Sequence, residues 1–418
     1  MFFSIKPLIK FFVIFFLLFD INFKFIPGFT TARCTFFALF IYSVLKLFKK
    51  NTIGSKSFYK SNALFIFTLF MIYLVAIIQY FFSDDITQLG RLTYFSLYGL
   101  ITPYLLSKYF NSRKEFLLLV GIAAVVQSIL TLASYFNPAV SNLFNNLILY
   151  NANFGQENKL RALGFATVAG ATLSVIEFTG IASLLIYMRN YPINFIKSFA
   201  IWLSIITILV AILFIGRTGL FLSLVAIIIY FLSFGLDIKK FLFLTLIFII
   251  FTQINYISIL DKFTNDVDGY NTELFLGWLN SGFRLNNDLV QGLSQMPIPE
   301  LTLRTLFGTG LVKDLSSGGN ASGHDTGYIQ TYYSLGLIFA IIFYSTYFLF
   351  LFKQAKKYKD YLGFLLILVL IVIESKEFFI FSYTFPLFLL SFILISQNEK
   401  IDNTTTTLFH EKVRIKNY

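Results

Sequence analysis

Apolar runs long enough to cross a lipid bilayer recur along almost the whole chain. Of its 418 residues, 57% are hydrophobic and 13% are charged, which is too little charge to cover a water-soluble surface of this size. A membrane-spanning helix needs about 20 mostly apolar residues, so the pattern predicts an all-α polytopic membrane protein with about 12 transmembrane helices. The predicted spans are residues 7–25, 32–48, 62–82, 91–107, 115–135, 163–188, 195–215, 218–236, 240–260, 327–352, 361–375 and 377–396.

Positive charge predicts the orientation of these spans. If the amino terminus is inside, the inner segments hold two thirds of the 33 Lys and Arg residues, which is the bias that the positive-inside rule requires. We therefore expect a transmembrane domain of residues 1–396 with both termini cytoplasmic, one large outer loop at 261–326, and a cytoplasmic tail at 397–418. The net charge of +12 then reflects topology, and no nucleic-acid partner is expected.

Few residues offer a metal site. The single cysteine, Cys34, excludes an intrachain disulfide and a cysteine-based metal cluster. Asp261, Asp266 and Asp268 lie close together, but their spacing lacks the register of an EF-hand. We expect neither a metal nor a cofactor.

Arginines on the predicted outer side are the first candidates for binding. Arg217 lies in IGRTGL, a very tight turn between two spans, and Arg161 opens RALGF just before a span rich in small residues. Arg284, in SGFRLNND, belongs to the long outer loop. A planar guanidinium suits phosphate oxygens, so these arginines are candidate anion ligands. The alternative is an interfacial or solvated arginine at each position.

A carboxylate near the middle of a predicted span is the second candidate. Thr167, Gly170, Ser174 and Glu177 share one helix face, and small residues on such a face allow close helix packing. Glu177 is about 18 Å along the helix from Phe165, at 1.5 Å per residue. A carboxylate at this depth is either a functional group or a protonated or paired structural one.

Polar residues flank the late spans. A glycine-rich segment leads through His324 and Asp325 into the span that starts near Tyr328, and its glycines allow turns or close approach to a substrate. Asp325 or Thr326 is a candidate helix cap, which leaves His324 unexplained. Since histidine gains and loses a proton close to neutral pH, His324 is a candidate general base. Lys376 and Glu377 form the last outer turn, either as a polar hairpin tip or as part of a site.

The order of these motifs resembles the O-antigen polymerase family, to which the O-antigen ligases are related. The resemblance covers most of the chain in layout, and it rests on RALGF at Arg161, IGRTG at Arg217, Arg284 followed by FGTG at 307–310, HDTGYIQTYYSLGLI at 324–338, and the Lys376–Glu377 pair. It implies a GT-C-like fold in the bacterial inner membrane. Asp325-Thr326-Gly327-Tyr328 looks more like a polymerase than a ligase.

The resemblance also implies a reaction. A glycosyltransferase of this kind joins undecaprenyl-diphosphate-linked oligosaccharide repeats on the outer face of the membrane, with the lipid diphosphate as leaving group. Arg161, Arg217 and Arg284 would bind the diphosphate, and His324 or Asp325 would accept the hydroxyl proton, with Glu177, Lys376, Glu377 and Tyr328 in support. Membrane lipids, a chain-length regulator and a flippase are the implied partners. An O-antigen ligase and a lipid-linked oligosaccharide flippase are the alternative functions.

The predicted topology is testable by cysteine labelling. In a Cys34-free background, cysteines introduced at Ser281 and Ser317 should react with a membrane-impermeant thiol reagent in intact spheroplasts, because both positions fall in the outer loop. Labelling at both sites only after lysis would contradict this orientation.

Overall fold

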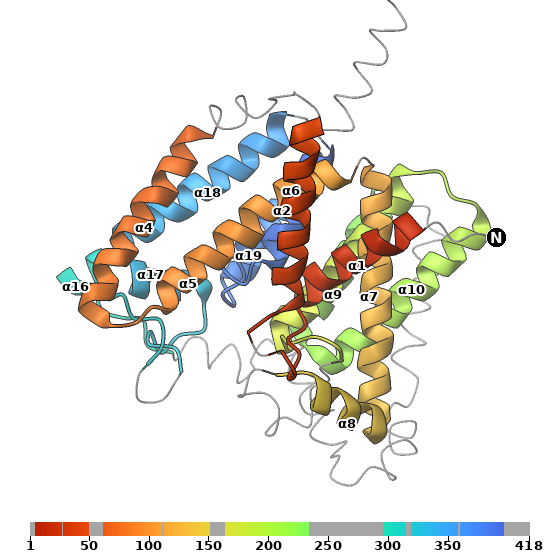
Figure 1. Cartoon of the computed structure of the whole chain (residues 1–418), viewed down its shortest axis with the longest axis horizontal. Coiled ribbons are helices and arrows are strands. Elements are labelled where there is room, and N and C mark those ends of the chain that lie inside the picture. Colours follow the sequence, from red (N-terminus) through yellow and green to blue (C-terminus); the bar gives the residue numbers. More distant parts are fainter. Residues whose placement is uncertain are drawn as a thin grey trace, which may run out of the picture. The chain divides into compact units, whose positions relative to one another are not determined.

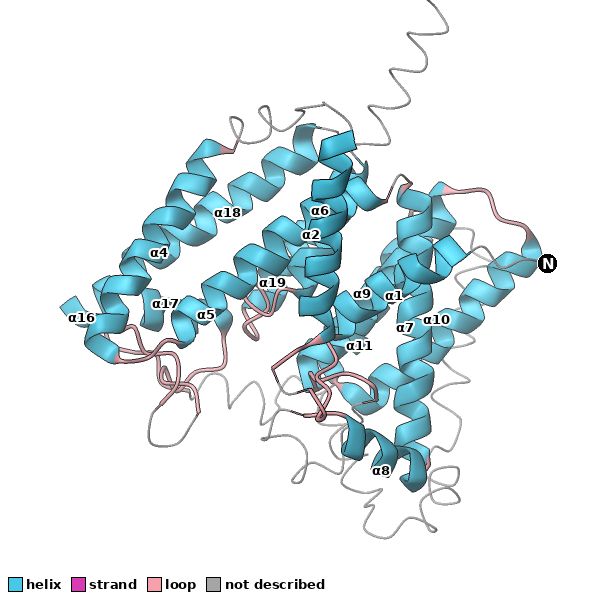
Figure 2. Cartoon of the chain, in the orientation of Figure 1, coloured by secondary structure: helices cyan, strands magenta, loops and turns pink. Residues whose placement is uncertain are grey.

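The computed structural model describes residues 5–26, 28–49, 62–110, 112–150, 164–233, 296–314, 319–357 and 360–396, and these are overwhelmingly helical (Figures 1 and 2). In chain order the helices are α1 (Ile5–Phe19), α2 (Thr31–Lys49), α4 (Ala63–Ser83), α5 (Thr87–Tyr94), the π-helix η1 (Phe95–Ile101), α6 (Thr102–Tyr109), α7 (Arg113–Phe136), α8 (Pro138–Leu147), α9 (Gly170–Asn190), α10 (Phe195–Ile215), α11 (Arg217–Leu232), α16 (Leu303–Phe307), α17 (Gly327–Leu335), α18 (Leu337–Lys357), α19 (Tyr361–Glu374) and a last helix, Thr384–Ser396.

The expectation of an all-α membrane protein is confirmed at the level of its helices. Five helices within the described part of the chain are long and apolar enough to cross a membrane, namely α4, α7, α9, α10 and α18. A helix also lies on each of the other predicted spans, except that residues 240–260 fall outside the described residues. The number of crossings and the GT-C-like fold stay predictions.

Several predicted boundaries are wrong, for reasons that are visible in the structure. The first helix ends at Phe19 rather than at residue 25, because Asp20 adopts a left-handed conformation with φ of 40°. The sixth begins at Gly170 rather than at 163. The twelfth begins at Thr384 rather than at 377 because the apolar stretch before it forms a buried turn around the carboxylate of Glu374.

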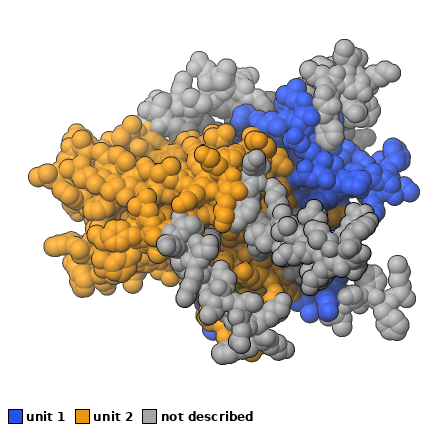
Figure 3. Space-filling model, turned by 90° about the horizontal axis from the view of Figure 1, so that it is seen from above, with its two compact units in different colours: residues 1–33, 117–291 blue, residues 34–116, 292–418 orange. Residues whose placement is uncertain are grey.

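The chain divides into two compact units (Figure 3), residues 1–33 with 117–291 and residues 34–116 with 292–418. In unit 1, α9 is buried along almost its whole length, packs against α11 and α10, and contacts α7. A Cβ atom added at Gly219 would lie 2.0 Å from the carbonyl oxygen of Ser174, and one added at Gly180 would lie 2.2 Å from the Cβ of Ala124. Small residues therefore allow close helix packing here, which confirms the prediction for Gly170 and Ser174, whereas Thr167 precedes α9 and is not on its face.

Unit 2 contains α4 beside α18 (Figure 1) and an aromatic core. The ring of Phe343 lies 5.6 Å from that of Phe95 and 5.2 Å from that of Phe381, between ring centroids. Tyr347 packs 5.1 Å from Phe95 and is fully buried. Edge and offset contacts of this kind stabilise the arrangement beyond the area that the rings bury.

The predicted tenth span is broken at Gly336, which has a φ of +95° and separates α17 from α18. The FGTG element docks onto this break. The N–H groups of Thr309 and Gly310 donate to the carbonyls of Tyr333 and Ser334, both at 3.0 Å. A helix end inside an apolar protein needs such partners, so the FGTG element supplies donors that the end of α17 would otherwise lack.

The same contact explains Gly308 and corrects one expectation. A Cβ on Gly308 would lie 2.2 Å from the side-chain nitrogen of Gln79 and 2.3 Å from the carbonyl carbon of Leu335. That amide nitrogen donates to the carbonyls of Phe307 (2.7 Å) and Leu335 (3.1 Å). Gly308 thus lets the backbone approach α4 and α17, and close approach of the other glycines to a substrate stays a prediction.

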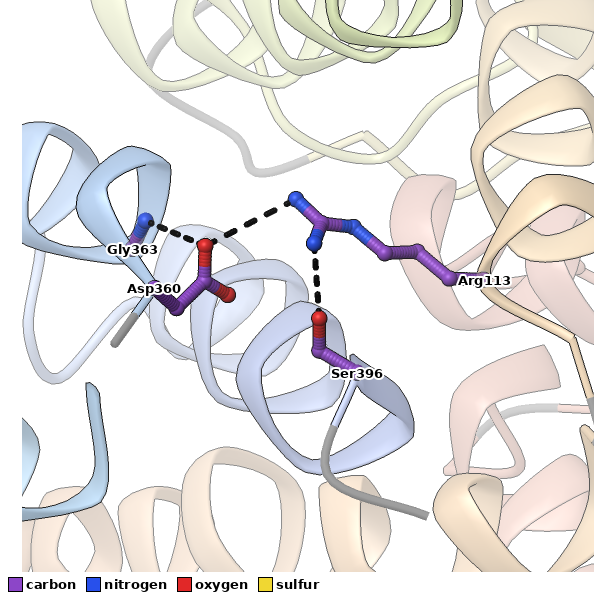
Figure 4. A network of polar contacts seen from close by, with 4 residues as sticks. All are labelled: Arg113, Asp360, Gly363 and Ser396. Carbon is purple, nitrogen blue, oxygen red and sulfur yellow. Dashed lines mark hydrogen bonds and ion pairs between the residues drawn. The ribbon is translucent and has the colours of Figure 1, made fainter. Parts of the chain in front are cut away.

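A buried ion pair joins three elements of unit 2 (Figure 4). A guanidinium nitrogen of Arg113 lies 3.7 Å from the carboxylate of Asp360, and both side chains are almost fully buried. Arg113 also donates to Ser396 at 2.7 Å and stacks over the ring of Phe392. Asp360 in turn accepts from the N–H of Gly363 and caps α19.

Removal of one partner should destabilise the protein strongly. Because Asp360→Ala leaves the buried guanidinium without its counter-charge, we expect a loss of roughly 3–5 kcal/mol, measured as a lower midpoint of thermal unfolding in detergent. The double variant Arg113→Met with Asp360→Leu, which removes both charges, should recover most of this loss. An Asp360→Ala protein as stable as the wild type would contradict the role of this pair.

Candidate functional site

His324 is held rigidly in the segment that precedes α17. Its side chain is only 6% exposed, although the segment around it is polar. The hydroxyl of Ser322 accepts from the N–H of His324 at 3.2 Å and donates to its carbonyl at 3.1 Å. The ring nitrogen Nδ1 accepts from the N–H of Thr326 at 3.1 Å. An accepting Nδ1 means that the neutral ring carries its proton on Nε2.

Asp325 is exposed, in contrast to His324. Its carboxylate accepts from the side-chain nitrogen of Asn320 at 3.2 Å, and its main-chain carbonyl accepts from the side chain of Gln330 at 2.9 Å. The N-cap position of α17 belongs to Thr326, whose side chain makes no capping hydrogen bond. The interpretation of Asp325 as the helix cap is therefore wrong, because the helix begins one residue later than that role requires.

The structure brings the His324–Asp325 segment together with the Lys376–Glu377 turn. The contact point is Gly327, where an added Cβ would lie 2.4 Å from the Oε1 of Glu374 and 3.0 Å from the carbonyl oxygen of Glu377. Any larger residue would displace the carboxylate of Glu374 and crowd the main chain of Glu377. Lys376 and Glu377 are both partly exposed. We call this group the histidine cluster, defined by His324, Asp325, Gly327, Lys376 and Glu377.

Glu374 organises the turn beneath the histidine cluster. The side chain is fully buried, and one carboxylate oxygen accepts from the N–H groups of Phe379 (2.9 Å) and Ile380 (2.8 Å). The other oxygen lies 2.9 Å from the hydroxyl of Tyr344, and the carbonyl of Gly327 lies 3.2 Å from the same hydroxyl, whose single proton is shared between these two acceptors. A single carboxylate thus holds both halves of the cluster in place.

Tyr328 has a structural contact of its own. Its hydroxyl donates to the carbonyl of Ile371 at 2.9 Å, and its ring packs 4.7 Å from that of Tyr344. The hydroxyl that the sequence suggested as a supporting group therefore joins α17 to α19.

Asp85 anchors the segment that follows the FGTG element. One carboxylate oxygen accepts from the N–H groups of Val312 (2.8 Å) and Lys313 (3.1 Å), and the other accepts from that of Thr87 (2.9 Å). Burial alone raises the pKa of Asp85, but these hydrogen bonds outweigh burial and hold the pKa below its ordinary value. Asp85 is therefore ionised at neutral pH.

Sequence reasoning missed Arg91, which lies next to the histidine cluster. Its guanidinium carbon is 3.8 Å from the centroid of the Phe378 ring, and Nη2 is 3.4 Å from the side-chain oxygen of Gln330. The signal was present in the sequence. Arg91 opens an apolar run, and the rule that marked Glu177 as a candidate applies equally to an arginine.

The remaining candidates lie elsewhere or outside the described residues. Arg161 and Arg284 belong to the latter group. Arg217 is the first residue of α11 and is half-buried in unit 1. Glu177, also in unit 1, is fully buried and accepts from the hydroxyl of Ser128 on α7 at 3.0 Å. The structure thus assembles the histidine cluster within unit 2, whereas Arg217 and Glu177 belong to unit 1.

The described residues of the histidine cluster offer an exposed carboxylate, a buried imidazole with a fixed hydrogen bond, and a partly exposed lysine on the adjoining turn. This set can accept a proton, donate a hydrogen bond and attract an anion. Among the residues with a described position, no group of three or more His, Cys, Asp or Glu side chains is arranged to hold a metal ion. Comparisons with protein-family models, with characterised proteins and with solved structures each found no match.

Proposed function

We propose that the chain is a membrane glycosyltransferase that polymerises polyprenyl-diphosphate-linked oligosaccharide repeats on the outer face of a bacterial inner membrane. Two lines of reasoning support the proposal. The order of the sequence motifs resembles that of the O-antigen polymerases, and the two motifs that the structure describes most fully meet at Gly327. The observation that carries it is the exposed carboxylate of Asp325 beside a buried, oriented histidine.

The proposed reaction is a single substitution at the anomeric carbon of the donor sugar. A hydroxyl oxygen of the incoming repeat forms a bond to that carbon, and the bond from the carbon to the lipid diphosphate breaks. The bonding electrons leave with the diphosphate as negative charge. The hydroxyl proton passes to a carboxylate or imidazole, so that atoms and charges balance.

Asp325 is the better placed of the two residues to accept the proton. Its carboxylate is exposed and bonded only through one side-chain amide among the contacts above. His324 offers Nδ1 as its unprotonated nitrogen, and the N–H of Thr326 already occupies that lone pair. In the proposal, therefore, Asp325 is the general base, and the Nε2–H of His324 donates a hydrogen bond to a substrate oxygen.

The departing diphosphate needs positive charge, because negative charge develops there as the bond breaks. Lys376 belongs to the histidine cluster and is partly exposed. Arg217 sits at the amino-terminal end of α11, where the helix dipole also favours an anion. We assign the diphosphate to Arg217 together with Arg161 and Arg284, as the resemblance implies.

Substitutions in the histidine cluster should distinguish the proposed proton acceptor, Asp325, from the proposed hydrogen-bond donor, His324. Asp325→Asn removes the proton acceptor and should lower turnover by about 10²–10⁴-fold. His324→Gln keeps an amide donor and should retain more activity than His324→Ala. The measurement is the lipid-glycan profile of cells that carry each variant as the only copy, with expression checked by immunoblot.

Asp84→Asn is the matched control, since Asp84 is an exposed carboxylate of the same unit and asparagine tolerates its left-handed conformation. Full polymer in Asp325→Asn cells would reject Asp325 as the base.

Cells that lack the chain should accumulate single repeats on lipid. Uncapped long polymer on its carrier would instead identify a ligase, and accumulation in the inner leaflet would identify a flippase.

Arg217 should act through its planar guanidinium, which can donate two parallel hydrogen bonds, as well as through its charge. We expect Arg217→Ala to shorten and deplete the polymer, and Arg217→Lys to restore only part of it, because lysine cannot form the bidentate contact. Polymer length and amount are read from gels at matched expression. Arg189→Ala, an exposed arginine at the end of α9 in the same unit, should have no effect. Unchanged polymer in Arg217→Ala would remove Arg217 from the diphosphate site.

A further inference from the structure

Arg91 is a cation that Gln330 connects to the main chain of the proposed base, and the reaction above assigns it no role. It belongs to α5 and is partly buried, with its guanidinium stacked on the ring of Phe378 at 3.8 Å. One guanidinium nitrogen, Nη1, is buried without a hydrogen-bond partner among the described residues. A charged group held in this way is costly in an apolar protein, so its presence calls for a role.

The two carboxylates that act on Arg91 electrostatically are Asp85 and Glu374. The carboxylate oxygens of both residues accept hydrogen bonds from other donors. Asp85 accepts from three backbone N–H groups, and Glu374 accepts from two such groups and from the hydroxyl of Tyr344. The hydrogen bond of Arg91 goes instead to a neutral amide, that of Gln330.

The amide of Gln330 can satisfy its two neighbours in only one orientation. Gln330 is buried on α17, with Oε1 facing Arg91 at 3.4 Å and Nε2 donating to the carbonyl of Asp325 at 2.9 Å. A guanidinium only donates and a carbonyl only accepts. A flipped amide would place its NH₂ against Arg91 and its oxygen against the carbonyl, with both contacts repulsive. Arg91 and the carbonyl of Asp325 therefore select the same orientation of the amide, and the contact with Arg91 reinforces the hydrogen bond to Asp325.

We propose that Arg91 is a positioning residue for Asp325 and acts through Gln330. Phe378 holds the plane of the guanidinium, and the guanidinium orients the amide of Gln330. The amide fixes the main chain of Asp325 and with it the direction of its carboxylate. We call this series of contacts, from Phe378 through Arg91 and Gln330 to Asp325, the relay. The carboxylate itself accepts an exposed hydrogen bond from the side chain of Asn320. Phe378 directly follows Glu377, so the relay also couples the two halves of the histidine cluster. The catalytic meaning of the relay rests on the proposed function, whereas the hydrogen-bonded relay itself does not.

Four variants separate the links of the relay. Arg91→Gln removes the charged guanidinium, so the amide of Gln330 loses the group that helps to orient it. Arg91→Lys keeps a charged donor and should restore part of the hydrogen bond to Gln330. Gln330→Glu keeps an acceptor for Arg91 but turns a carboxylate oxygen toward the carbonyl of Asp325, which breaks the second link. Arg304→Gln is the matched control, because Arg304 is an exposed arginine of the same unit.

The first experiment measures order at position 325 without any assay of function. A spin label on Asp325→Cys, in a Cys34→Ser background, should become more mobile in Arg91→Gln and in Gln330→Glu, intermediate in Arg91→Lys, and unchanged in Arg304→Gln. A label on Tyr361→Cys, exposed at the start of α19, should not respond to any of them. Equal mobility at position 325 in all backgrounds overturns the relay.

The second experiment measures turnover in variants that retain Asp325 and unfold at the wild-type temperature. Misplacement of a catalytic group by about 1 Å costs roughly 10²-fold. We expect Arg91→Gln and Gln330→Glu to lower kcat by that order while KM for the lipid-linked donor stays within about twofold, with partial recovery in Arg91→Lys. A raised KM at unchanged kcat overturns the positioning role and makes Arg91 a ligand contact. If Asp325→Asn is fully active while the label still responds, the proposed base fails and the relay stands.

Discussion

Satisfaction of backbone hydrogen bonds inside an apolar protein is the constraint on which unit 2 depends. A buried N–H or carbonyl group that leaves a helix needs another partner, because an unpaired one is costly away from water. Buried polar side chains supply these partners. Gln79 serves the carbonyls at the end of α17, Asp85 serves the N–H groups of Val312 and Lys313, and Glu374 serves those of Phe379 and Ile380.

This use of polar residues divides unit 2 into two groups of side chains. In the first, buried side chains bond mainly to the backbone, through the amide nitrogen of Gln79, both carboxylate oxygens of Asp85 and one carboxylate oxygen of Glu374. This group stabilises irregular chain between helices. The second group is His324 and the exposed Asp325, to which the proposed function assigns the chemistry. The first group makes the second possible, because a broken helix and a buried turn must be stable before they can present reactive groups.

Arg91 and Gln330 link these two groups. Gln330 is buried like the structural residues, yet its hydrogen bond ends on the main chain of the proposed base. Preorganisation of this kind is valuable in catalysis, since a base that is already oriented loses little freedom when the substrate arrives. It also accounts for a guanidinium that bonds to an amide when two carboxylates are close by.

The sequence by itself determined the helical, membrane-type character of the chain, because a run of about 20 apolar residues is a local property that composition reports directly. It also marked the small residues of α9 as a packing face and identified both halves of the histidine cluster. Only the tertiary structure decided that the tenth span breaks at Gly336, that the stretch before Thr384 is a turn, that Asp325 is not a helix cap, and that Arg91 belongs beside it. The reason is that these features depend on hydrogen bonds between residues far apart in the chain, such as that from Gln79 to Leu335 across 256 positions. The pattern of apolar residues is the same whether the backbone partners are local or remote.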